Sequence, residues 1–190
     1  MPNLGLIVEG VYDEAVLPVF IRKLVPDAII ATRVANGRVH RKIAGLLPGI
    51  RGNDRVLVVA DADICASDLR LPQCEGRLVN ACREVGCDRL KPVMLVQEME
   101  VLLLADADAI NAVCHNRRIL TGRDLPPHRG SAESIRDPKE FLERILGSWG
   151  IRYTARVAGE IAEAVDLDML GNWCPRSFGS LRAAATGGLR

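Results

Sequence analysis

Short apolar runs alternate with helix-like periodicity along the first half of the chain. The runs cover residues 4–8, 28–34, 55–60 and 93–96. The third contains Val56-Leu57-Val58-Val59, which is apolar throughout, as expected for a strand covered on both faces. Between the runs, apolar residues at helical spacing predict helices over 11–25, 39–47 and 74–85. This alternation predicts a parallel sheet joined by right-handed crossovers.

The pattern changes after Gln97. Apolar spacing then predicts helices over 99–104, 110–114, 138–146, 152–165 and 176–184, with Asp137 as an N-cap and a Pro/Gly-rich loop over 122–134. The sequence therefore predicts an α/β, Rossmann-like fold: a mostly parallel four-stranded sheet flanked by helices, with a helical C-terminal extension. We expect residues 1–106 to form the α/β core and residues 107–190 to form the extension packed on it.

The composition fits a globular protein, with 48% hydrophobic and 26% charged residues among 190 and a net charge of +1. No apolar run approaches the ~20 residues that span a membrane, and no signal segment is apparent, so no membrane association is expected. The six cysteines show no C-x2-C pair, which argues against a structural zinc site. We expect them to be reduced and buried in a cytoplasmic protein.

Acidic residues follow three of the four predicted strands. Because ligands gather at the carboxyl ends of parallel strands, these acids are expected to share one edge of the sheet. Asp13 lies one helical turn beyond the first of them, so it can face the same pocket. Clustered carboxylates repel one another unless a cation lies between them, and oxygen ligands favour Mg²⁺ or Mn²⁺ over zinc. The candidate ligands are Glu9 after the first strand, Asp61 and Asp63 after the third, and Glu98 and Glu100 after the fourth. The competing interpretation is that these are solvated loop acids or helix caps.

Basic residues form two clusters. One lies between residues 33 and 53, where no acid occurs, and the other follows residue 116. Such clusters bind nucleic-acid backbones without reading sequence, although a solvated surface would have the same composition. Neither a P-loop nor a G-x-G-x-x-G motif is present, so no nucleotide cofactor is expected at those loops. The candidates for DNA or RNA binding are Arg33, Arg38, Arg41, Lys42, Arg51, Arg117 and Arg118.

Two segments resemble the motifs of Toprim domains. Leu6-Ile7-Val8-Glu9-Gly10, with Asp13 three residues later, looks like the first motif, and Val58-Val59-Ala60-Asp61-Ala62-Asp63 looks like the second. The resemblance implies a Toprim fold in which Glu9 serves general acid/base chemistry while Asp61 and Asp63 hold magnesium.

Three further stretches resemble one bacterial Toprim-like family related to the OLD-family nucleases. They are residues 97–106, Asp137-Pro138-Lys139, and residues 174–178; Leu102 departs from the pattern, where an aromatic residue is expected. Members of this family often accompany an SMC-like or AAA-type ATPase in defence modules. The pattern favours Glu100 over Glu98 as the acid that faces the site, and Lys139 is placed to neutralise charge on a phosphate.

The resemblance implies a Mg²⁺- or Mn²⁺-dependent nuclease in bacterial defence or DNA repair. Glu9, Asp13 and Lys139 are then the catalytic candidates. An aspartyl phosphatase would carry its D-x-D after the first strand, not the third. The alternative that stays open is a non-catalytic or partner-dependent regulatory subunit of the ATPase.

Overall fold

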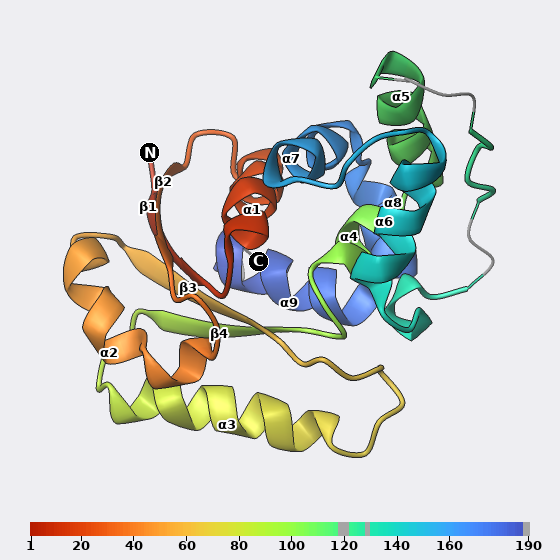
Figure 1. Ribbon diagram of the computed structural model, residues 1–190. Coiled ribbons are helices and arrows are strands. Elements are labelled where there is room, and N and C mark those ends of the chain that lie inside the picture. The colour runs from red at the N-terminus through yellow and green to blue at the C-terminus, as the bar shows by residue number, and fades with distance from the viewer. Residues whose placement is uncertain (118–121, 128–129, 188–190) are drawn as a thin grey trace.

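The computed structural model describes residues 1–117, 122–127 and 130–187 and contains a four-stranded, all-parallel sheet (Figure 1). The strands are β1 (Asn3–Val8), β2 (Ile29–Val34), β3 (Arg55–Asp61) and β4 (Leu90–Leu95), in the order β2-β1-β3-β4. The predicted four-stranded parallel sheet is therefore confirmed. Parallel pairing brings the carboxyl ends of β1 and β3, the two central strands, side by side.

Alternate residues of the strands face two hydrophobic clusters. Leu6, Leu57 and Val93 belong to the cluster beneath α1 (Val11–Leu24), α7 (Ala155–Ala164) and α9 (Pro175–Thr186). Ile7 and Val58 belong to the other cluster, beneath η1 (Val39–Arg41), α2 (Ile43–Leu46), η2 (Leu47–Ile50) and α3 (Leu71–Glu84). The sheet is thus covered on both faces, which accounts for its apolar strands (Figure 1).

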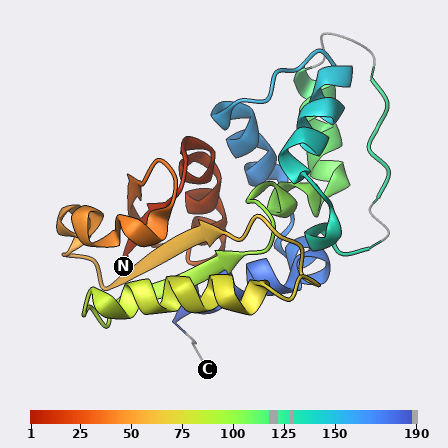
Figure 2. The same ribbon diagram turned by 60° about the horizontal axis from the view of Figure 1, so that its bottom comes forward.

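The remaining helices lie beyond the carboxyl ends of β3 and β4 (Figures 1 and 2). They are α4 (Glu100–Leu104), α5 (Ala107–Arg117), η3 (Ala132–Ser134), α6 (Pro138–Ser148) and α8 (Leu167–Trp173). Two helices from the last third of the chain return to the sheet layer, since α7 packs against α1 and α9 packs against β4. No described helix has the length and apolar character needed to cross a membrane.

Two cations fix the returning helices by capping their carboxyl ends. The Lys23 Nζ atom donates hydrogen bonds to the carbonyl oxygens of residues 162, 163 and 165 at the end of α7 (2.9, 2.7 and 2.7 Å). The Arg55 Nη1 atom donates to the Ala184 and Ala185 carbonyls at the end of α9 (3.1 and 2.7 Å). Positive charge at these ends satisfies free carbonyls and complements the helix dipole.

Several local predictions are wrong. The single helix predicted over 39–47 is replaced by η1, α2 and η2, because Gly45, Pro48 and Gly49 do not sustain a long helix. The helix predicted from residue 152 begins at Ala155, where the Thr154 hydroxyl accepts a hydrogen bond from the Val157 N–H (3.3 Å). Helix α8 was not predicted. Of the six cysteines, all unpaired, three are buried and Cys65, Cys74 and Cys87 are half-buried, so burial was predicted too broadly.

Candidate functional site

Backbone hydrogen bonds continue past the strand ends and hold the site loops in place. After β1, the N–H of Gly37 donates to the Glu9 carbonyl (3.0 Å). After β3, the N–H of Asp63 donates to the Gln97 carbonyl (3.0 Å), and both residues adopt left-handed backbone conformations (φ 54° and 62°). An Asp tolerates this conformation better than most residues, and such positions concentrate at functional sites. The loops that carry Glu9, Asp63 and Glu98 are therefore hydrogen-bonded to the loops that follow neighbouring strands.

Asp61 lies at the centre of a group of carboxyl groups. Burial raises the pKa of Asp61 well above its ordinary value, and the negative charges of its neighbours raise that pKa further. Like charges have this effect only when they lie near one another. Asp13 and Glu100 are buried, whereas Asp63 is exposed. The neighbours that contribute are Asp13, Glu100, Glu9 and Asp63, in decreasing order. The structure thus brings together acids from the ends of β1 and β3 and from the start of α4.

The individual acids differ in how they are held. Asp13 is buried on the first turn of α1, accepts a hydrogen bond from the Gly10 N–H (2.8 Å), and has a pKa raised to about 6, mainly by burial. Glu100 is buried, accepts a hydrogen bond from the Tyr153 hydroxyl (2.9 Å), and has a pKa raised to about 7, again mainly by burial. Burial also raises the pKa of Glu9, although a hydrogen bond from the Val39 N–H lowers it.

Glu98 is held differently from Glu100. Its carboxylate accepts a hydrogen bond from the Lys139 backbone N–H (3.2 Å) on the first turn of α6. Asp137 occupies the N-cap position there, as predicted, with φ 48°. Its side chain makes no capping hydrogen bond, and Glu98 accepts from this turn instead. Burial raises the pKa of Glu98. Of the two glutamates, Glu100 is the one whose charge acts on Asp61.

Two tyrosines connect Lys139 with Glu100. The rings of Tyr12 and Tyr153 stack with centroids 4.9 Å apart, and the Lys139 Nζ atom lies 4.9 Å from the centroid of Tyr12. This distance is in the range of a cation–π interaction. The positive charge of Lys139 also lowers the pKa of Asp13, which burial raises. Lys139 therefore lies at the acid group, held against the face of an aromatic pair.

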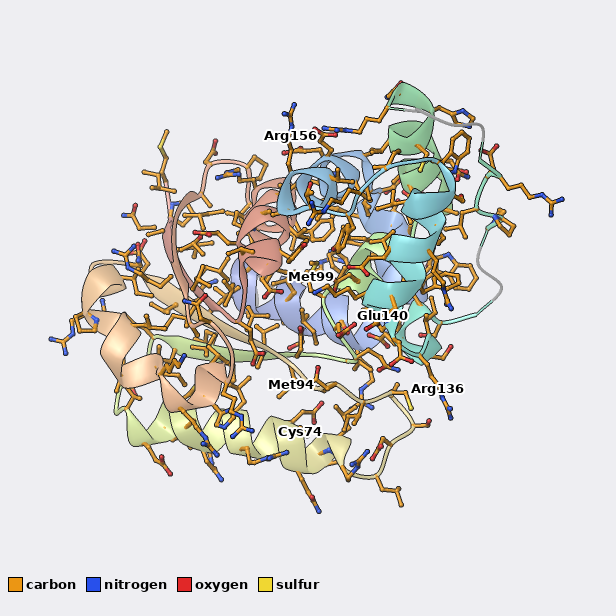
Figure 3. All side chains as sticks on the ribbon, in the orientation of Figure 1. Cys74, Met94, Met99, Arg136, Glu140 and Arg156 are labelled. Carbon is orange, nitrogen blue, oxygen red and sulfur yellow. The ribbon has the colours of Figure 1, made fainter. Side chains whose placement is uncertain are left out.

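A cleft of about 310 Å³ opens at the strand ends, with acids and bases on different elements. Glu9, Asp61 and Asp63 line it from the sheet side. The segment around η1 and helix α3 contribute the basic lining residues, which are Arg38, His40, Arg41 and Arg77. Cys74 on α3 and Met94 on β4, both labelled in Figure 3, line the cleft between helix and sheet. Three carboxyl groups and three guanidinium groups thus share one cleft.

Of the predicted nucleic-acid-binding residues that the structure describes, only Arg38 and Arg41 line this cleft. The Lys42 Nζ atom instead donates to the Ala35 and Asn36 carbonyls (2.5 and 3.0 Å) and thereby stabilises the loop after β2. The Arg33 Nη2 atom lies 3.4 Å from the Gly49 carbonyl.

Arg51 precedes β3 and lies at the opposite end of the sheet. Arg117 forms an ion pair with Glu160, and Arg118 lies outside the described residues.

Arg77 and His40 were not among the residues predicted to bind. A sequence signal for Arg77 existed: a helix that follows an acid-ended strand begins at the acid-bearing edge of a parallel sheet, so basic residues in its first turns face the same cleft.

A divalent cation fits the chemistry of this donor set. Within the described ranges, no three His, Cys, Asp or Glu side chains are already arranged as a metal-binding group. All the candidate donors are carboxylate oxygens, which suit Mg²⁺ or Mn²⁺. The raised pKa values of Asp61, Asp13 and Glu100 reflect burial and repulsion, and a cation among the acids would relieve the repulsion.

Comparison with known proteins supports the fold. No family model matches the sequence, and no curated protein matches it. Among solved structures, the chain is similar to the C-terminal region of the Burkholderia pseudomallei OLD protein, with a TM-score of 0.53 and 15% sequence identity. The match covers 97% of this chain and 99% of that chain. The predicted resemblance to OLD-type Toprim proteins is therefore confirmed at the level of the fold.

Proposed function

We propose that this protein is a Mg²⁺- or Mn²⁺-dependent nuclease of the Toprim type, which hydrolyses phosphodiester bonds in DNA or RNA. The observation that carries the proposal is the group of acids around Asp61, whose pKa is raised by burial and by four neighbouring carboxylates. Retaining mutually repelling acids costs stability unless they bind a cation. The fold similarity to the OLD C-terminal region supports the same assignment.

In this proposal Asp61, Asp63, Glu9 and Glu100 hold the cation, with Glu98 at the margin of the site. A bound divalent cation polarises a phosphate oxygen and lowers the pKa of water. The protein supplies the rest. Glu9 and Asp13, whose pKa values are raised, are placed to hold or accept a proton.

Lys139 is placed to offset negative charge that develops on the phosphate. Tyr153 orients the Glu100 carboxyl group through its hydroxyl.

A second candidate function is a non-catalytic or partner-dependent subunit of an SMC-like or AAA-type ATPase in bacterial defence. The observation that favours it is that the described acids are not yet arranged as a metal-binding group. An ATPase partner that reshapes the strand-end loops could complete the site. In that case the isolated protein would leave nucleic acid intact, and the Asp61→Ala variant would associate more weakly with the ATPase.

The test is cleavage of plasmid and single-stranded DNA, and of RNA, by the purified protein with Mg²⁺ or Mn²⁺. We expect Asp61→Ala and Glu9→Ala each to lower the cleavage rate at least about a hundredfold, the scale on which lost charge stabilisation slows such reactions. Asp54→Ala, which removes an exposed acid before β3 at the other end of the sheet, is the matched control. Equal cleavage by the wild type and the Asp61→Ala variant would refute the proposal.

A further inference from the structure

The three arginines of the cleft form no ion pair with any acid that the structure describes. Within residues 1–117, 122–127 and 130–187, no ion pair joins Arg38, Arg41 or Arg77 to a carboxylate, although Glu9, Asp61 and Asp63 line the same cleft. Opposite charges that share a cleft without pairing leave both sets available to a ligand. A phosphate bound together with its cation carries the complementary charges, because its oxygens suit guanidinium groups and its cation suits carboxylates.

His40 shows that these positive charges lie close together. Burial lowers the pKa of His40, and the charges of Arg41, Arg77 and Arg38 lower it further. The three arginines and His40 line the same cleft, from the segment around η1 and from α3, so their positive charges lie near one another. A convergence of like charges is unfavourable in isolation and becomes favourable when an anion binds between them.

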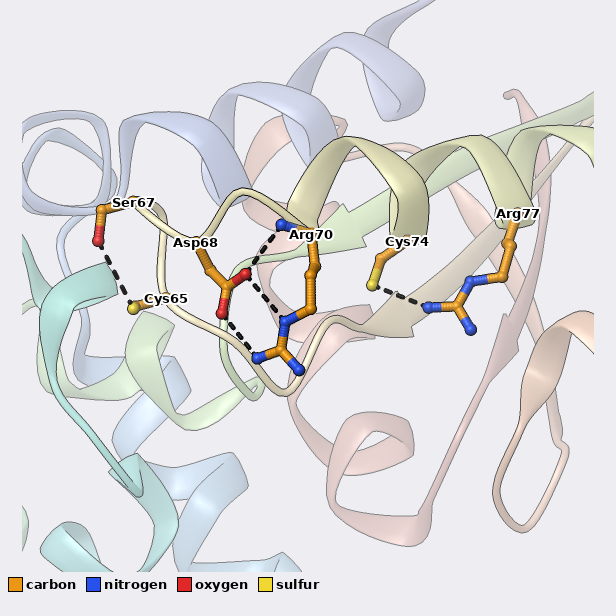
Figure 4. Close-up of polar contacts among 6 residues, drawn as sticks. All are labelled: Cys65, Ser67, Asp68, Arg70, Cys74 and Arg77. Atoms are coloured by element: carbon orange, nitrogen blue, oxygen red, sulfur yellow. Dashed lines mark hydrogen bonds and ion pairs between the residues drawn. The ribbon is translucent and has the colours of Figure 1, made fainter.

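The elements that carry these arginines are fixed. Lys42 ties together the carbonyls of Ala35 and Asn36, in the turn that presents Arg38 in a left-handed conformation (φ 37°). The Arg77 Nη2 atom donates to the Cys74 Sγ atom one turn earlier on α3 (3.1 Å), which orients the guanidinium (Figure 4).

Arg70, in the loop before α3, is different, since its Nε and Nη2 atoms both donate to the Asp68 carboxylate (3.0 and 2.7 Å; Figure 4). It is already neutralised, so it is not part of the subsite.

We propose that Arg77, with Arg38, His40 and Arg41, forms a backbone-phosphate subsite that seats a nucleic-acid strand against the acid group. This inference rests on the proposed function for its substrate class. It assigns the α3 side of the cleft, and not the other basic surfaces, as the place where the strand is held. Contacts of this kind add affinity without reading sequence, and each contributes to the dependence of binding on salt.

The experiment measures binding of a fluorescent oligothymidylate of about 20 nucleotides to the full chain in EDTA, by fluorescence anisotropy, between about 50 and 200 mM salt. We expect Arg77→Gln to weaken binding about threefold or more and to reduce the slope of log affinity against log salt by about 0.7, the value for one lost contact to a single strand. Arg41→Gln is expected to behave similarly. Arg83→Gln, on the last turn of the same helix, and Arg51→Gln, at the opposite end of the sheet, should keep the wild-type slope.

The Arg77→Lys variant distinguishes the loss of positive charge from a disturbance of the fold. It keeps one positive charge at this position, so it should retain most of the salt dependence of binding. Equal slopes in all the proteins, or no binding by the wild type, would overturn the inference. Since binding is measured without metal, its outcome is independent of catalysis. If Arg77 contributes to strand binding but the strand is never cut, the nuclease proposal is refuted and the phosphate subsite is supported. If the strand is cut but its binding does not depend on Arg77, the subsite is refuted and the nuclease proposal is supported.

Discussion

Buried carboxyl groups occur in two regions of this protein, and the two regions accommodate negative charge in different ways. Among the helices, Asp106 accepts hydrogen bonds from the backbone N–H groups of residues 108, 109 and 166 (3.1, 3.2 and 2.9 Å). Glu133 accepts one from the Ser177 N–H on the first turn of α9 (2.6 Å). At the strand ends, burial raises the pKa values of Asp61 and Glu100, and the negative charge of Asp13 raises both further.

The difference lies in what each acid faces. Asp106 and Glu133 each meet free backbone N–H groups at the start of a helix, and these hydrogen bonds satisfy their oxygens. A carboxylate among other buried carboxylates meets like charge and little solvent, so its ionised form is destabilised. The same residue types therefore strengthen the fold in one region and weaken it in the other, which is the pattern expected of a binding site maintained at some cost to stability.

The largest expected effect on stability is at Asp106. Asp106→Ala should lower the free energy of unfolding by about 1–3 kcal/mol, because it removes the cap of α5 and leaves the part-buried Asp166 N–H without its acceptor. Urea denaturation measures the change. Asp108→Ala, on the exposed first turn of the same helix, is the control and should have a much smaller effect. If both variants lost the same stability, the capping role of Asp106 would be wrong.

Replacing Glu100 is expected to raise the stability of the metal-free protein, in contrast to the loss expected at Asp106. The pKa of Glu100 is raised from 4.5 to about 7, so the folded state binds its proton more tightly than the unfolded state does. Protonated Glu100 makes its full contribution to stability below about pH 4.5. This contribution, at most about 3 kcal/mol, is lost as the pH rises through about 7. Glu100→Gln should therefore stabilise the metal-free protein by about 1–3 kcal/mol at pH 8 and change it little at pH 4.

Thermal and urea denaturation at both pH values, in EDTA, test this prediction. Glu143→Gln, an exposed change on α6, is the matched control and should show no such pH dependence. Adding millimolar Mg²⁺ or Mn²⁺ should raise the melting temperature of the wild type and reduce the advantage of the variant, because the cation binds the ionised acids. A Glu100→Gln variant less stable than the wild type at pH 8 would show that the acid is not electrostatically strained.

The sheet could be predicted from the sequence because its strands are mainly apolar runs, three of which are followed by acids. Glu9 and Asp61 follow such runs directly, so topology alone places them at one edge. The resemblance favours Glu100 over Glu98, but the sequence does not reveal how each is held. Glu100 begins α4, whereas Glu98 precedes that helix and accepts a hydrogen bond from the first turn of α6.

Other features depended on contacts between distant segments. Arg77 and Arg38 are far apart in the sequence, and only the packing of α3 beside η1 brings them to one cleft. Lys42 looked like any other cation of its cluster, because its use of two nearby carbonyls depends on the left-handed turn at residues 36–38. The local sequence is enough to predict the fold class. It does not show which charged side chains already have partners within the protein.

The smallest expected effect is at Tyr153, where the two regions meet. The Tyr153 hydroxyl lowers the pKa of Glu100 by donating to its ionised carboxylate, while burial keeps that phenol protonated by raising its own pKa. Tyr153→Phe removes the donor and keeps the ring stacked on Tyr12, so about 1 kcal/mol of stability should be lost at pH 8. The pKa of Glu100 should also rise, which moves the acid limb of the cleavage rate toward higher pH.

Tyr12→Phe keeps the stack and should leave that limb unchanged, because no hydrogen bond joins its hydroxyl to Glu100 among the described residues. A Tyr153→Phe variant with a lower rate but an unshifted pH profile would make the hydroxyl a packing contact only, and Glu100 would then be tuned by burial alone.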